Sequence, residues 1–203
     1  MDITIRKYKI KYMMNIKFLV GCMLLFSIVL QAQGRRKNQS AIHAEYGYML
    51  NSDSLKKGGY TAKIGYMKVL GDKGFIGKAE AFYSDYKINY IDGQVLPYQK
   101  YGLNINAGYS YEGLYPVMLN AFFGVYGAYE NVNKGNQKDP LYNAEIPYKV
   151  KGFVYGLSGS AEAEIYLIRR MSLLLNYSQF YDLKSKFSKS NYALFGGLRF
   201  YIN

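Results

Sequence analysis

The stretch that decides the fold is Tyr101-Gly-Leu-Asn-Ile-Asn-Ala-Gly-Tyr-Ser-Tyr111. Its odd-numbered positions carry Tyr, Leu, Ile and Ala, whereas its even-numbered positions carry Gly, Asn and Ser. Because successive residues of a β-strand point to opposite faces, this alternation predicts a strand with one apolar face and one small, polar face. An apolar outside around a polar inside is the reverse of a soluble barrel, so the pattern indicates strands that face lipid.

The same alternation recurs from about residue 41 to the end of the chain. The segments that carry it follow one another with no helical segment between them. The pattern predicts strands near residues 41–49, 60–70, 74–85, 98–111, 115–130, 151–167, 171–181 and 191–202. We therefore expect residues 41–203 to form one all-β domain.

The connections between these segments alternate in length. The expected short connections are residues 71–74, 112–114 and 168–170, and the expected long ones are residues 51–59, 86–97, 131–150 and 182–190. Outer-membrane barrels alternate short periplasmic turns with longer extracellular loops. The predicted fold is an up-and-down antiparallel outer-membrane β-barrel of about eight strands, and the predicted location is the outer membrane of the cell.

The two faces of these strands differ in the size of their side chains. The inner face is rich in Gly, Ser, Ala and Asn, whereas the outer face carries Leu, Val, Phe and Ile, with Tyr near the strand ends. The interior of an eight-stranded barrel is barely wide enough for side chains. The composition therefore favours a filled lumen over a pore, and an outer face that contacts membrane lipid.

Charged residues within the strands fall mainly on the inner face. They are Glu45, Lys63, Lys78, Glu80, Glu162, Glu164 and Arg199. An unpaired charge in a narrow lumen is costly, so we expect these side chains to pair with one another. The set is either a path for protons or ions, or a salt-bridged plug that holds the barrel in register. Because the numbers of positive and negative side chains nearly balance, the pattern favours the salt-bridged plug.

The N-terminus resembles an export signal. Lys17 ends a short basic segment, and an apolar run from Phe18 to Leu30 follows it. That run is too short to span a bilayer comfortably as a helix. The small residue Ala32, followed by Gln33, suits cleavage by a signal peptidase between these two residues.

These features divide the chain into three parts. We expect residues 1–32 to be an N-terminal extension with a cleaved signal peptide, and residues 33–40 to be a short basic linker before the barrel domain. Translation from Met1 and translation from Met14 both remain open.

The excess of basic residues alone would suit nucleic-acid binding, but their distribution along the chain argues against direct sequence-specific binding. The chain has 203 residues, with 26 Lys and Arg against 14 Asp and Glu, and a net charge of +12. The basic residues form no single helical stripe. Many lie in the longer loops: Lys56, Lys57, Lys134, Lys138, Lys149, Lys184, Lys186 and Lys189. They either contact lipopolysaccharide, anionic surface polymers or a protein partner, or form a solvated loop surface.

The sequence offers little for catalysis. His43 is the single histidine, and Glu45 shares its strand face. A hydrolytic site would also need a nucleophile and a substrate beside this pair, so a packed or ion-paired histidine is the simpler interpretation. The single cysteine, Cys22, lies within the export signal. We therefore expect no enzyme activity, no cofactor and no transition-metal cluster.

Three segments of the chain resemble a known family. They are Gln94-Val-Leu-Pro-Tyr-Gln-Lys-Tyr-Gly-Leu103, Asn133 to Pro147, which includes Lys-Asp-Pro-Leu-Tyr-Asn-Ala-Glu-Ile-Pro, and Tyr181-Asp-Leu-Lys-Ser-Lys-Phe-Ser-Lys-Ser190. They are similar to the TraO family of conjugal transfer proteins, which conjugative transposons of Gram-negative gut and oral bacteria encode. The resemblance runs from about Ala44 to Asn203. It implies a part in the apparatus that moves DNA between cells, and it implies no catalytic residues.

Two functions are compatible with these observations. The first is an outer-membrane accessory or structural component of a conjugative, type IV secretion-like DNA transfer apparatus, with other transfer-apparatus proteins as partners. The alternative is a small general surface β-barrel for adhesion or envelope stability. A lipid-acting enzyme and a soluble ligand-binding barrel are weaker hypotheses.

Overall fold

The computed structural model describes residues 37–50, 59–71, 74–90 and 93–202. The expected signal peptide, with its cleavage site between Ala32 and Gln33, lies outside these residues, as do Lys56 and Lys57. Among the described residues, no helix is long and apolar enough to cross a membrane.

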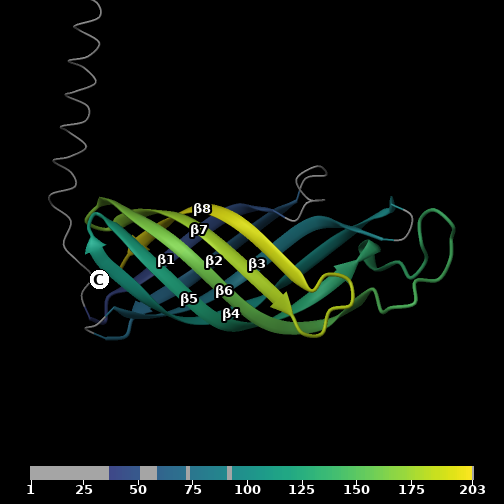
Figure 1. The fold of residues 1–203 in the computed structure, drawn as a ribbon, viewed down its shortest axis with the longest axis horizontal. Coiled ribbons are helices and arrows are strands. Elements are labelled where there is room, and N and C mark those ends of the chain that lie inside the picture. The colour runs from purple at the N-terminus through teal and green to yellow at the C-terminus, as the bar shows by residue number, and fades with distance from the viewer. Residues whose placement is uncertain (1–36, 51–58, 72–73, 91–92, 203) are drawn as a thin grey trace, which may run out of the picture.

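Eight antiparallel strands, each paired with its neighbours in chain order, close into one barrel (Figure 1). The strands are β1 (Ser40–Met49), β2 (Tyr60–Val69), β3 (Phe75–Asn89), β4 (Val95–Leu114), β5 (Val117–Val132), β6 (Lys151–Ile168), β7 (Met171–Asp182) and β8 (Ser190–Tyr201). A short 3₁₀ turn, η2 (Asn133–Gly135), follows β5. The pairing of β1 with β8 leaves neither strand as a free edge.

The strands are staggered around the barrel. The register can be followed from Ser40 on β1 through each paired residue in turn until Tyr192 on β8 is reached. The carbonyl of Tyr192 accepts a hydrogen bond from the N–H of Leu50, ten residues beyond Ser40. Such a stagger requires strands inclined to the barrel axis, typically by about 35–45°. With eight strands, it also leaves an interior that side chains fill.

The two ends of the barrel differ. At one end, hereafter the turn end, the turn between β4 and β5 and the turn between β6 and β7 have two residues each, Tyr115-Pro116 and Arg169-Arg170. β1 begins and β8 ends at this same end, where Figure 1 marks the C-terminus. The longer connections, including residues 133–150, project from the opposite end, hereafter the loop end (Figure 1).

The expected long loop at residues 86–97 is wrong. β3 continues to Asn89 and β4 begins at Val95, so only five residues connect them. The strands extend because inward apolar side chains continue to pair beyond the expected ends. The rings of Tyr86 and Tyr98 lie 4.7 Å apart between centroids, and both side chains are buried.

The predicted phase of the strands is confirmed. On β4, Tyr101, Leu103 and Ile105 are exposed, whereas Asn104 and Asn106 are buried. The other strands alternate in the same way, so the outer surface carries many large apolar side chains. Such a surface suits hydrocarbon rather than water.

The expectation of a uniformly small and polar inner face is only partly right. Small and polar residues do line the lumen, but large side chains lie among them, including Met67, Phe122, Tyr126 and Phe180. Two of these rings, Phe122 and Tyr126, sit opposite the inward glycines Gly108 and Gly156, whose missing side chains leave space. Gly108, for example, leaves the space that the ring of Phe122 occupies, because a Cβ on Gly108 would lie 2.5 Å from that ring.

Gly102 tests this fit. A Cβ on this β4 residue would lie 2.6 Å from the Cα of Ala128 on β5, too close for the backbone to accept. We expect Gly102→Ala to lower the free energy of unfolding by about 1–3 kcal/mol. The measurement is urea unfolding of the refolded barrel in lipid vesicles, followed by circular dichroism.

Gly196→Ala is the matched control. Gly196 lies on the outer face of β8, and a Cβ there would meet no atom within 4 Å. Its effect should stay within about 0.5 kcal/mol. Equal losses in the two variants would show that backbone flexibility, rather than crowding in the lumen, decides the outcome.

Candidate functional site: the charged lumen

All seven charged residues singled out in the sequence lie inside the barrel, and their side chains are buried. They come from five strands: Glu45 from β1, Lys63 from β2, Lys78 and Glu80 from β3, Glu162 and Glu164 from β6, and Arg199 from β8. The stagger of the strands brings these positions to a similar depth. The structure therefore assembles one cluster, hereafter the charged layer, from residues far apart in the chain.

Arg199 is the centre of one half of the charged layer. One terminal nitrogen, Nη1, lies 2.8 Å from Glu162 Oε1 and 2.5 Å from Glu164 Oε2, and Nη2 lies 3.1 Å from Glu162 Oε2. Ser172 and Tyr201 donate hydrogen bonds to the remaining oxygen of Glu164. This guanidinium group thus forms charge-assisted hydrogen bonds with two carboxylates that sit two residues apart on β6.

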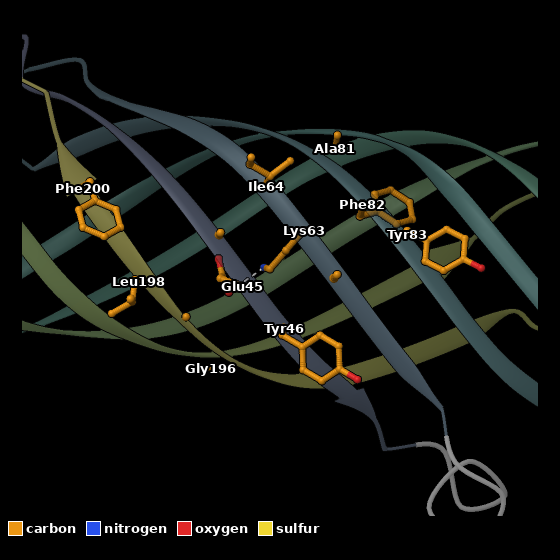
Figure 2. A pocket seen from close by; sticks show the side chains of 13 residues that line it. Glu45, Tyr46, Lys63, Ile64, Ala81, Phe82, Tyr83, Gly196, Leu198 and Phe200 are labelled. Atoms are coloured by element: carbon orange, nitrogen blue, oxygen red, sulfur yellow. Dashed lines mark ion pairs between the residues drawn. The ribbon is translucent and has the colours of Figure 1, made fainter.

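The lysines form the other half. Lys63 Nζ lies 3.2 Å from Glu45 Oε2 and 3.4 Å from Glu80 Oε1, and Figure 2 shows its ion pair with Glu45 across β1 and β2. Lys78 Nζ lies 3.1 Å from Glu80 Oε1 and 3.5 Å from Glu162 Oε2. Lys78 therefore connects the lysine half to the arginine half, and the charged layer is continuous.

Aromatic faces complete the surroundings of the two ammonium groups. Lys63 Nζ lies 4.3 Å from the ring centroid of Phe195, and Lys78 Nζ lies 4.1 Å from that of Phe122. The negative face of an aromatic ring attracts a cation, and more strongly where water is excluded. Both lysines thus have a carboxylate and a π-face to replace their hydration.

His43 belongs to the charged layer as well. Its Nε2 lies 3.1 Å from Glu80 Oε1 and 3.8 Å from Glu45 Oε1. Donor atoms of these three residues lie within 4.8 Å of one another, a grouping with the dimensions of a metal site. Lys63 contacts both carboxylates, so the chain itself supplies positive charge at this position.

A second charged group, which was not predicted from the sequence, lies nearer the loop end. Lys100 Nζ on β4 lies 2.6 Å from Asp182 Oδ1 on β7, and its ammonium lies 4.8 Å from the ring centroid of Tyr126. Glu130 on β5 accepts hydrogen bonds from Tyr98 and from Ser185. The signal was present: Lys100 and Glu130 continue the inward phase of β4 and β5, and Asp182 continues that of β7.

Apolar clusters bound the charged layer along the axis. At the turn end, Ala41, Met67, Met118, Tyr166 and Tyr201 pack together. Toward the loop end, the rings of Phe82, Tyr126 and Phe180 contact one another, with centroids 5.3–5.9 Å apart. The charged layer is therefore enclosed between packed apolar side chains.

The loops contribute to a further apolar cluster at the loop end. Ile146 and Val150, from the connection between β5 and β6, are buried in it beside Leu96 and Tyr98. Phe187, from the connection between β7 and β8, packs against the same cluster. These two connections thus contribute side chains to the apolar cluster at the loop end.

Comparisons with known proteins agree with this architecture. No protein-family model matches the chain, and no curated protein matches it. Several solved structures are similar. A major outer membrane protein from Thermus thermophilus has a TM-score of 0.60 at 13% identity, over 82% of this chain and 100% of that chain. OprG from Pseudomonas aeruginosa has a TM-score of 0.55 at 9% identity, over 85% and 100%.

Neisserial surface protein A has a TM-score of 0.53 at 16% identity, over 83% of this chain and 99% of that chain. At these identities the likeness shows the fold. This protein is a closed, eight-stranded, antiparallel up-and-down barrel of the kind found in outer-membrane proteins, as the sequence predicted. Nothing among the comparisons supports the TraO family specifically.

The charged layer predicts a large effect at Arg199. Arg199→Met removes the cation between Glu162 and Glu164 and leaves both carboxylates buried, so we expect the free energy of unfolding to fall by about 3–5 kcal/mol. Urea unfolding of the refolded barrel measures this loss. Arg170→Met, in an exposed turn, should change stability by no more than about 0.5 kcal/mol.

A triple variant separates charge from packing. Adding Glu162→Gln and Glu164→Gln to Arg199→Met removes the uncompensated charge and should restore at least half of the lost stability. A triple variant that is no more stable than Arg199→Met would contradict the electrostatic account.

Proposed function

We propose that this protein is a small, non-conducting surface β-barrel of the outer membrane that serves adhesion or envelope stability. The observation that carries the proposal is the filled lumen, in which a charged layer lies between packed apolar clusters. Buried charges of opposite sign that satisfy one another make a structural plug, whereas an ion path needs water and groups that ions can approach.

Location in the outer membrane belongs to the same proposal. The exposed belt of Leu, Ile, Phe, Val and Tyr supports it, as does the similarity of the fold to solved outer-membrane proteins. Export would depend on residues 1–32, with cleavage between Ala32 and Gln33. The loop end would then face outward from the cell, and the lipid of the outer membrane would be the main partner of the barrel wall.

Conductance tests the plug. The refolded protein in a planar lipid bilayer should show no stable open channel at moderate voltage. Removing one ion pair of the charged layer with Lys63→Met and Glu45→Gln should also give no open channel, because the apolar clusters on either side remain. A stable, ion-selective conductance in the unmodified protein would refute a non-conducting barrel.

Deletion of the gene tests the role in the cell. Loss of the protein should increase sensitivity to detergents and bile salts or reduce surface attachment, and plasmid or transposon transfer should stay normal. The protein should fractionate with the outer membrane and migrate differently on a gel before and after boiling. Recovery in the soluble periplasmic fraction would exclude the proposed location.

One observation favours a second candidate function. The segments 94–103, 133–147 and 181–190 resemble the TraO family, whose proteins act in conjugal transfer, and the resemblance implies an accessory or structural role in a conjugative DNA transfer apparatus. The comparisons give this role no support. A transfer assay with the deletion strain discriminates the two: a large fall in transfer with an intact envelope would favour the apparatus, with its other proteins as partners.

A further inference from the structure

Five exposed lysines gather at the loop end on the side of β6 to β8. They form the lysine rim: Lys149, Lys151, Lys184, Lys186 and Lys189. Within segments 133–151 and 182–190, two acids, Asp139 and Asp182, are buried, and Glu145 is exposed. Asp182 is already paired with Lys100. The rim therefore carries a net positive charge that its own acids do not neutralise.

Contacts between the two loops hold the rim together. The rings of Tyr148 and Phe187 meet edge to face, with centroids 6.0 Å apart. Ser185 donates a 2.8 Å hydrogen bond to Glu130, which ties the loop after β7 to β5. The N–H of Leu183 donates to the carbonyl of Tyr155 on β6. Lysines from both connections are thus held close to the end of β6.

An apolar groove lies on the outer wall below the rim. It occupies about 440 Å³ and is shared by β5, β6 and β7. Its lining includes Phe123, Leu157, Ala161, Tyr177 and Tyr181, with Gly159 contributing no side chain. Leu157 and Tyr181 are paired neighbours at its upper end.

The outward side chains of β6 connect rim and groove in a definite order. From the loop end they are Lys151, Phe153, Tyr155, Leu157 and Gly159. A cation comes first, two aromatic rings follow, and an apolar groove comes last. A phosphorylated lipid of the outer leaflet presents the complementary order, with phosphate at the surface and acyl chains below it.

We propose that the lysine rim and the groove on β5 to β7 together bind a phosphorylated, multiply acylated glycolipid of the lipid A type. The lysines contact its phosphates, the aromatic residues lie at the level of its sugars, and an acyl chain occupies the groove. A soluble polyanion would use the lysines alone and would leave the groove without a role. The inference rests on the proposed location in the outer membrane and specifies how the barrel would stabilise the envelope.

Native mass spectrometry tests the binding directly. The folded protein in detergent micelles is titrated with purified bisphosphorylated lipid A, with dephosphorylated lipid A and with heparin. We expect a saturable one-to-one adduct with the bisphosphorylated lipid. Lys151→Gln, Lys184→Gln and Lys186→Gln combined should weaken it by at least about ten-fold. The corresponding Lys→Arg variant should retain binding.

Matched variants address the charge and the groove separately. Lys68→Gln, Arg169→Gln and Arg170→Gln combined remove three exposed cations at the turn end and should leave lipid A binding unchanged. Gly159→Leu places a side chain in the groove and should weaken binding several-fold. The barrel should accept this side chain, because a Cβ at Gly159 meets only one backbone oxygen, 4.0 Å away. Ala81→Leu, in the separate groove of Figure 2, should have no effect.

Three outcomes would overturn the inference: equal binding of dephosphorylated lipid A, wild-type affinity in the rim variant, or heparin binding as tight as lipid A binding and insensitive to Gly159→Leu. Altered mobility on heating shows which variants are folded, and the Lys→Arg variant tests the rim if the Lys→Gln variant does not fold. Failure of the proposed function would instead appear as an open channel or as a soluble protein, independently of lipid A binding.

Discussion

The structure depends on one constraint: a closed barrel of eight strands has an interior that admits side chains and little else. Each inward polar group must therefore find its partner within the barrel. Arg199 between Glu162 and Glu164, and Lys63 between Glu45 and Glu80, are solutions to this constraint. The same constraint explains inward glycines such as Gly108 and Gly156, where the ring of a neighbouring strand occupies the space that a side chain would need.

The outer wall obeys the opposite rule, because nothing in the described part of the chain covers it. Its side chains contact the surrounding medium rather than each other, so the residue type at each position depends on its depth in the membrane. Along β6 the outward residues pass from a lysine through aromatic rings to small and aliphatic residues. Along one strand, the inward residue types are therefore determined by their partners inside the barrel, and the outward residue types by their position across the membrane.

The number of strands, their phase and the closure of the barrel were predictable from the sequence. The alternation of apolar and polar residues is a local property of each strand, and it recurs often enough that errors at strand ends do not change the fold. The seven inward charges were also predictable from phase. Their partners were not, since Lys78 meets Glu162 through a stagger that no single segment reveals. The extension of β3 and β4 was missed because Pro97 and the polar residues near Asn89 resemble a loop. The contact between Tyr86 and Tyr98 that continues the hairpin forms only in the folded barrel, so the local sequence does not reveal it. Lys100 and Glu130 were missed although they lie on the inner face of the strands expected at residues 98–111 and 115–130, whereas Asp182 was missed because the expected strand ended one residue before it.

The position of Arg199 on β8 has a consequence for how the barrel is made. Glu162 and Glu164 lie on β6, yet the guanidinium group that pairs with both of them belongs to β8, the last strand. A barrel that lacked β8 would combine an open edge with two carboxylates deprived of their main cation. The addition of β8 therefore closes the hydrogen-bonded wall and supplies the missing cation in the same step. A partly assembled barrel is unfavourable for both reasons, so assembly should be cooperative.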